Sequence, residues 1–177
     1  MLAINDIPHI HSFAPIEDAA AKVLILGSMP GKESLRARQY YAHPRNAFWP
    51  IMSELIGANA ALPYELRVQK LKASYIALWD VLASCKRHSS LDADIDTGSI
   101  SPNDFEAIFL THPYITHIFF NGAMAEKCLH EYVELAFESR LLQFKRLPST
   151  SPANASMTFS QKLNAWKVIN ETCRIKL

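Results

Sequence analysis

The sequence predicts an α/β protein, a three-layer α/β/α sandwich with a central, mostly parallel sheet of four strands. Four short runs rich in apolar and β-branched residues predict the strands, at residues 22–27, 74–82, 116–121 and 141–147. Helical patterns lie between these runs, and this alternation favours right-handed crossovers and parallel pairing. The runs 22–27 and 116–121 lack polar alternation, which is typical of strands covered on both faces.

Three amphipathic stripes predict helices that pack on this sheet. They comprise Phe48, Ile51, Met52, Leu55 and Ile56; Ala125, Cys128, Leu129, Tyr132 and Ala136; and Leu163, Trp166, Ile169 and Cys173. Pro50 falls in the first turn of the first helix, where its missing N–H costs little. A further helix start is predicted at residues 101–104, with Ser101 as N-cap, Pro102 at N1 and Asp104 at N3.

The composition fits one globular domain over residues 1–177, since 49% of the residues are apolar and 20% are charged. The formal net charge of +1 means that any surface for nucleic acid must be a local basic patch. Cys85, Cys128 and Cys173 have no paired spacing, which favours free thiols in a reducing compartment. No signal peptide or membrane-spanning run is recognisable. We therefore expect a cytoplasmic monomer, associated with the nucleoid if the cell is prokaryotic, with no membrane partner.

Polar or backbone-shaping residues follow all four predicted strands. These strand tails are residues 27–31, 79–80, 121–122 and 147–150. In open parallel sheets, ligands bind beyond the carboxyl ends of the strands. The tails therefore predict one ligand site at that edge of the sheet.

The first tail belongs to residues 27–34, GSMPGKES, which partly match a phosphate-binding loop. A P-loop has four residues between its first Gly and the Gly-Lys-Ser/Thr, whereas this segment has three, and Glu33 separates Lys32 from Ser34. A nucleotide-binding α/β protein is therefore the less favoured function, and a tight strand-to-helix turn is the simpler interpretation.

Residues 39–49, QYYAHPRNAFW, concentrate aromatic rings, an amide, an imidazole and a guanidinium. Asn46 taken alone is best interpreted as a cap of the following helix, but its neighbours favour a place in a base pocket. Candidates for stacking on a flat base are Tyr40, Tyr41 and Phe48, the last of which also suits the core, and candidates for phosphate contacts are His43 and Arg45.

Residues 26–49, LGSMPGKESLRARQYYAHPRNAFW, and residues 147–155, LPSTSPANA, resemble the uracil-DNA glycosylase superfamily, and within it the hypoxanthine-DNA glycosylase family most closely. The similarity covers most of the chain. It implies a four-stranded α/β/α sandwich and a monofunctional enzyme that hydrolyses the N-glycosidic bond. It also implies DNA with a damaged or mismatched base as the partner, and neither metal nor cofactor.

The resemblance implies residue roles as well. Many relatives position the catalytic water with Asp or Asn before the Pro of the first loop, where this chain has Met29. In the hypoxanthine branch the Asn of HPRN replaces that residue, which makes Asn46 the catalytic candidate. Asp80 aligns with an Asn that contacts the base in many relatives, and a helix cap or structural hydrogen bond is an equal alternative. Further base contacts are expected from Gly27, Ser28, Met29 and Asn121.

The relatives carry His-Pro-Ser-Pro or Asn-Pro-Ser-Gly where this chain has Leu147 and the Pro-Ser segment after it. In those proteins the loop grips the phosphate backbone and pushes a wedge into the base stack, so the resemblance implies the same here without a polar group at Leu147. The expected DNA contacts are Ser149, Thr150, Ser151 and Asn154, and the wedge candidates are Asn154, Met157 and Phe159.

Two other patterns resemble metal sites. Residues 92–96 have Asp at alternate positions, but Thr97 and Asn103 stand where a calcium loop needs Gly and Glu, so a polar surface loop is expected. The two histidines at residues 9–11 have no further ligand nearby in sequence. Basic residues that could track phosphates near the strand ends are Lys32, Arg36, Arg38, Arg45, Lys86, Arg87, Lys145 and Arg146.

The leading hypothesis is a DNA glycosylase that flips hypoxanthine out of the helix and excises it. Asp80 could accept a hydrogen bond from N1–H of the base or act as an acid, and backbone N–H groups near Ser28 and Asn121 could bind O6. The alternatives are a uracil or G·U/G·T mismatch glycosylase, which Met29 and Leu147 disfavour, the nucleotide-binding protein, and an inactive DNA-binding relative.

Overall fold

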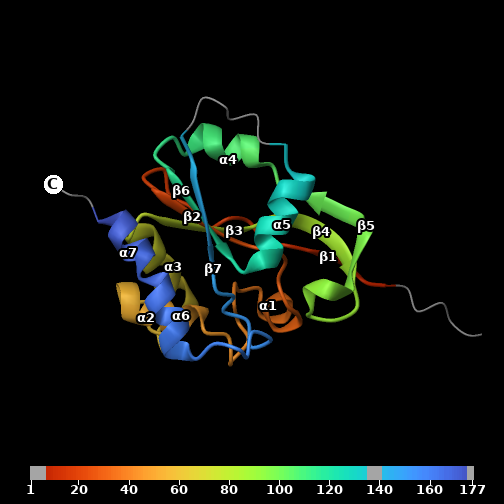
Figure 1. Ribbon diagram of the computed structural model, residues 1–177, viewed down its shortest axis with the longest axis horizontal. Coiled ribbons are helices and arrows are strands. Elements are labelled where there is room, and N and C mark those ends of the chain that lie inside the picture. Colours follow the sequence, from red (N-terminus) through yellow and green to blue (C-terminus); the bar gives the residue numbers. More distant parts are fainter. Residues whose placement is uncertain (1–6, 135–140, 175–177) are drawn as a thin grey trace, which may run out of the picture.

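A parallel four-stranded sheet lies at the centre of the computed structural model, which describes residues 7–134 and 141–174. Its strands, in spatial order, are β3 (Ile76–Asp80), β2 (Val23–Gly27), β6 (His117–Asn121) and β7 (Gln143–Leu147). All pairings are parallel, and β2 and β3 are buried along their whole length. The predicted four-stranded parallel sheet is therefore confirmed (Figure 1).

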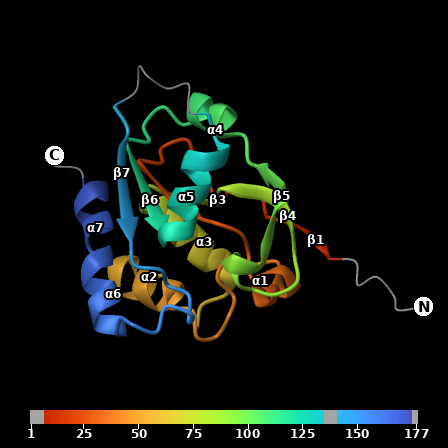
Figure 2. The same cartoon turned by 45° about the vertical axis from the view of Figure 1, so that its right-hand side comes forward.

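Helices pack on both faces of this sheet. Both views show α6 and α7 on one side and α4 and α5 on the other, and α5 and α7 each contact β2 (Figures 1 and 2). The helices are α1 (Lys32–Ala37), α2 (Phe48–Ile56), α3 (Tyr64–Ala73), α4 (Phe105–Thr111), α5 (Ala123–Tyr132), α6 (Phe159–Trp166) and α7 (Val168–Cys173). The α/β/α sandwich expected from the sequence is thus present.

A second, antiparallel sheet lies beside the first, and the sequence did not predict it. Its order is β1 (His9–His11), β4 (Leu82–Arg87) and β5 (Ile95–Pro102), with the short 3-10 helix η1 (Asp92–Asp94) between β4 and β5. The strand expected at residues 74–82 is therefore too long. Ser74 caps α3, and after Asp80 the chain leaves the central sheet, so that Leu82 pairs with Pro102 in the second sheet.

Two helix boundaries also differ from the sequence-based prediction. Ser101 pairs with Ser84 within β5, so it cannot cap a helix, and Asp104 instead caps α4 by accepting the Ala107 N–H at 3.0 Å. The last stripe forms two helices that break at Lys167, and Ala136 of the preceding stripe lies outside the described residues. Within the described ranges, no helix has the length and apolarity needed to cross a membrane.

Candidate active site

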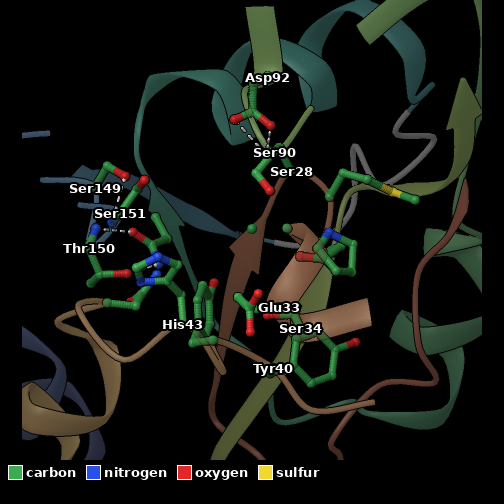
Figure 3. A pocket seen from close by; sticks show the side chains of 18 of the residues that line it. Ser28, Glu33, Ser34, Tyr40, His43, Ser90, Asp92, Ser149, Thr150 and Ser151 are labelled. Atoms are coloured by element: carbon green, nitrogen blue, oxygen red, sulfur yellow. Dashed lines mark hydrogen bonds between the residues drawn. The ribbon is translucent and has the colours of Figure 1, made fainter. Parts of the chain in front are cut away.

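The four strand tails meet around one pocket with a volume of about 150 Å³ (Figure 3). It opens at the carboxyl ends of β2, β3 and β6 and is bordered by the loop after β7. Most of the site residues proposed from the sequence line it: Gly27, Ser28, Met29, Tyr40, Tyr41, His43, Asn46, Asp80, Asn121, Ser149, Thr150 and Ser151.

Asp80 supplies a buried carboxyl group at the end of β3, with only 3% of the residue exposed. Its Oδ2 accepts the Ser12 hydroxyl at 2.6 Å, and a Cβ atom on Gly27 would lie 2.5 Å from its Oδ1. Glycine at the end of β2 therefore lets the carboxyl group approach the backbone. Burial raises the pKa of Asp80 to about 7, since the opposing effects of the Ser12 hydroxyl and Arg87 are smaller.

Two tyrosines form an aromatic wall of the pocket. Tyr40 is held in place because its hydroxyl donates to the carbonyl of Ala14 at 3.1 Å. Tyr41 has a φ of 55° and stacks on Phe48 with ring centroids 4.2 Å apart. Phe48 does not line the pocket, because it is fully buried beneath Tyr41 as part of the core.

The Tyr41 hydroxyl is buried, and no group in the described part of the chain forms a hydrogen bond with it. It would lie 3.0 Å from a Cβ atom on Gly27, at the pocket end of β2. Burial and the charge of Asp80 raise the pKa of Tyr41, against a smaller lowering by the Asn121 amide. The hydroxyl therefore stays protonated and remains a free hydrogen-bond donor beside the pocket.

Asn46 lines the pocket and lies one residue before Ala47, the N-cap of α2, so it is not the cap itself but bonds the first N–H of the helix. Its Oδ1 accepts the Phe48 N–H at 2.9 Å, while its own N–H donates to the His43 carbonyl at 2.9 Å. No group among the described residues bonds its Nδ2, which leaves two amide protons available to a ligand. His43 Nδ1 accepts the Arg45 N–H at 3.1 Å, and the exposed Arg45 side chain lies outside the pocket.

Thr150 joins three segments of the site. Its N–H donates to Asn121 Oδ1 and its Oγ1 accepts from Asn121 Nδ2, both at 2.8 Å. Its carbonyl accepts the Ala47 N–H at 2.9 Å, directly beside Asn46. Thr150 is fully buried, so it acts as a structural link, and the Asn121 side chain is engaged by it.

The loop after β7 is anchored from α6. Trp166 Nε1 donates to the Pro148 carbonyl at 2.9 Å, and the buried Lys162 donates through Nζ to the Asn154 carbonyl at 2.9 Å. Ser149 Oγ accepts the Ser151 N–H at 3.2 Å, which tightens the turn. The loop is therefore fixed from behind and presents its serines to the pocket.

Of the wedge candidates, Asn154 is occupied within the loop, outside the pocket lining. Its Nδ2 donates to the Ser149 carbonyl at 3.1 Å, and its Oδ1 accepts the Ser156 hydroxyl at 2.9 Å. Phe159, the first residue of α6, is 44% exposed, and Met157 is half-buried.

Asp92 is a pocket residue that the sequence-based interpretation missed, because it was assigned to a polar surface loop. Both of its carboxylate oxygens accept from the Ser28 hydroxyl, at 2.9 and 2.8 Å. Arg87 lies behind it, with Nη1 3.7 Å from Asp92 Oδ1 and Nη2 donating to the Pro30 carbonyl. Arg87 is 1% exposed, so the expectation that it contacts phosphates is wrong.

Further residues line the pocket without having been assigned an individual role from the sequence, most of them in the loop after β2 and the start of α1. Lys32 donates its N–H to Ser90 Oγ at 2.9 Å, which ties this loop to the turn before Asp92. The additional lining residues are Pro30, Gly31, Lys32, Glu33, Ser34, Ser90 and Pro152. Within residues 7–134 and 141–174, no group of three or more His, Cys, Asp or Glu side chains is arranged to hold a metal ion.

The fold and the pocket define an α/β protein with a pocket at the carboxyl edge of a parallel sheet, the place where such folds bind ligands. The chain belongs to the uracil DNA glycosylase superfamily, whose family model matches residues 14–172. The resemblance seen in the sequence is thereby confirmed.

Individual relatives agree with this assignment. Proteins named hypoxanthine DNA glycosylase from Methanosarcina acetivorans and Methanosarcina barkeri are each 33% identical to the chain, over 89% and 85% of its length and 95% and 91% of theirs. The solution structure of a putative uracil DNA glycosylase from Methanosarcina acetivorans has a TM-score of 0.76 and 32% identity. That comparison covers 94% of this chain and all of the other.

Proposed function

We propose that the chain is a DNA glycosylase that excises hypoxanthine from DNA by hydrolysing the N-glycosidic bond. The names of the Methanosarcina relatives support this substrate. The observation that carries the proposal is the position of Asn46, whose amide lines the pocket while Met29 stands after β2. Met29 has no group that orients water, so the polar chemistry shifts to Asn46.

Cleavage breaks the bond between C1′ and the base nitrogen, and its electron pair leaves with the base. A water oxygen bonds to C1′ and loses a proton, so the products are an abasic sugar and, after protonation, neutral hypoxanthine. Oδ1 of Asn46 has a lone pair left to orient the water, and Nδ2 can donate to charge that develops on the base. Asn46 therefore acts on the reacting atoms, while α2 holds its side chain still.

The base must leave the duplex before it can enter this pocket. Tyr40 lines the pocket with a ring on which the base can stack, and base–aromatic stacking contributes roughly 1–3 kcal/mol in single-strand binders. Ser149 and Ser151, held by the anchored loop, supply phosphate contacts at the pocket entrance. The monomeric state and cytoplasmic location expected from the sequence stay predictions.

Incubation with three duplexes tests the proposal, each with a single hypoxanthine, uracil or mismatched thymine, followed by alkaline cleavage of abasic sites. Strand cleavage with hypoxanthine is the expected result. Cleavage only at uracil or thymine would favour the mismatch-glycosylase alternative, which is consistent with the uracil DNA glycosylase name of the solved relative. Hydrolysis of a nucleotide without any base release would favour the nucleotide-binding protein.

A further inference from the structure

The Ser28 hydroxyl lines the pocket and has its only proton committed to Asp92. The Ser28 Oγ lies 2.9 and 2.8 Å from the two Asp92 oxygens. A carboxylate can only accept, so the serine must donate, and its oxygen then has only lone pairs for a ligand. Toward the pocket, Ser28 is therefore a hydrogen-bond acceptor and cannot act as a donor.

The buried Arg87 guanidinium favours the ionised form of Asp92. The guanidinium side chain is fully buried, and its Nη1 lies 3.7 Å from Asp92 Oδ1. Arginine does not lose its proton in proteins, so its buried charge needs a nearby anion. Burial raises the pKa of Asp92, but the Ser28 hydroxyl and Arg87 both oppose that change.

The Tyr41 hydroxyl complements Ser28 because it is a donor without a partner. It is buried, and the described residues offer it no hydrogen bond. It lies close to Gly27, the residue that precedes Ser28, because a Cβ on Gly27 would be 3.0 Å from it. One acceptor and one donor thus belong to the lining of the same pocket, and a buried donor without a partner is unfavourable.

The two deamination partners present opposite patterns at the edge of the purine ring. Hypoxanthine has a donor at N1–H next to an acceptor at O6, whereas adenine has an acceptor at N1 next to a donor at N6. Asp80 is the weaker choice for N1–H, because its Oδ2 already accepts from Ser12 and its Oδ1 packs against Gly27. We propose that Ser28 Oγ accepts from N1–H and Tyr41 Oη donates to O6, with Asp92 and Arg87 as positioning residues for Ser28. This inference rests on the proposed hypoxanthine excision and assigns its specificity.

Binding of uncleaved duplexes separates recognition from chemistry. Hypoxanthine and unsubstituted purine, each on a 2′-fluoroarabino sugar that resists cleavage, are placed in the same duplex, because purine lacks both N1–H and O6. Ser28→Ala and Tyr41→Phe are each expected to weaken binding of the hypoxanthine duplex about tenfold or more and to leave the purine duplex within about twofold. Asp92→Asn is expected to reduce the preference for the hypoxanthine duplex over the purine duplex. The amide of the new asparagine can donate to Ser28 Oγ, which leaves the serine proton free to point toward the pocket.

Matched controls come from the same parts of the chain. Asp94→Asn alters the same turn, η1, at a side chain that is exposed and outside the pocket, and Tyr114→Phe removes an exposed hydroxyl. Both controls should leave both affinities unchanged, and thermal unfolding reports whether each variant folds. Equal losses for hypoxanthine and purine, or no loss with Ser28→Ala and Tyr41→Phe, would overturn the assignment. Failure of the unaltered protein to release hypoxanthine from a cleavable duplex would instead overturn the proposed function, and the specificity with it.

Discussion

Asn121 and Thr150 hold each other through two hydrogen bonds of 2.8 Å, across 29 residues of sequence. The pair connects the end of β6 to the loop after β7. Because the Thr150 carbonyl also accepts the Ala47 N–H, the same residue fixes the start of α2, where Asn46 lies. The geometry of the proposed catalytic amide therefore depends on a residue from the opposite end of the chain.

Replacing Thr150 with Val tests this link. The substitution keeps the shape of the side chain but removes Oγ1, so Asn121 Nδ2 loses its acceptor. We expect a loss of about 1–3 kcal/mol in the free energy of unfolding and slower single-turnover excision. Thr172→Val serves for comparison, because Thr172 Oγ1 bonds only the Val168 carbonyl within α7. Equal effects of the two substitutions would show that Thr150 has no special part in the site.

Asn46→Asp separates the local structural role of this residue from catalysis. Aspartate retains the oxygen that accepts the Phe48 N–H at the start of α2, so the unfolding free energy should change little, whereas Asn46→Ala should lose about 1 kcal/mol. Excision by both variants should fall by at least about a hundredfold, because both lack the amide donor. Asn59 forms the same type of turn, with its Oδ1 accepting from Ala61 N–H, and lies outside the pocket. Asn59→Asp should excise normally, and full activity of Asn46→Asp would exclude a role for the amide.

Three strands of the central sheet, β2, β3 and β6, were predictable because they are short, apolar and largely buried, whereas β7 is a mostly exposed edge strand. The run at β2 carries this signal by itself, with every residue buried. The second sheet gives no such signal, because β4 contains Ser84 and Arg87 among its buried positions and β5 is mostly exposed. Its strands are specified by pairing with each other, which local sequence does not encode.

The site residues that were predicted carry a local sequence signal, and the one that was missed depends on contacts between distant segments. Asp80 ends β3, so the strand-end rule places it in the site, whereas Asn46 was found through the dense polar and aromatic segment 39–49 and its family resemblance. Asp92 reaches the pocket only because the β4–β5 connection folds back onto Ser28, 64 residues away in sequence. Phe48 was expected to contact the base because it follows the pocket motif in sequence. It lies in the core instead, where its ring supports the Tyr41 ring.

The buried carboxyl of Asp80 predicts a change in the pH dependence of stability. Burial raises its pKa in the folded state from 3.8 to about 7, so folding favours the protonated form. The contribution of Asp80 to the unfolding free energy is therefore complete below pH 3.8 and is lost as the pH rises through about 7. Asp80→Asn should remove this decline, giving a flatter unfolding free energy in urea between about pH 4 and about pH 8. The Asp94→Asn protein should keep the decline of the parent, and an unchanged slope in Asp80→Asn would contradict the prediction.

Substitution of Lys162 tests whether anchoring of the loop after β7 contributes to excision of the base from DNA. Its ammonium group donates to the Asn154 carbonyl at 2.9 Å from beneath the loop, where the buried side chain cannot reach DNA itself. Lys162→Met preserves the buried aliphatic length and removes only the donor. We expect about tenfold slower single-turnover excision of hypoxanthine, because the serines lose their fixed position relative to the pocket.

The exposed Lys167, at the break between α6 and α7, provides the matched substitution. Lys167→Met removes the same charge without changing a contact to the loop. If the charge only contributed to general electrostatic attraction of DNA, both variants would lose excision rate to the same extent. An equal loss of excision rate in Lys162→Met and Lys167→Met, with the same dependence of that rate on salt concentration, would refute the anchoring role of Lys162. A loss confined to Lys162→Met that persists at saturating enzyme would locate the effect in the arrangement of the bound site, since weaker DNA binding alone is overcome by enzyme concentration.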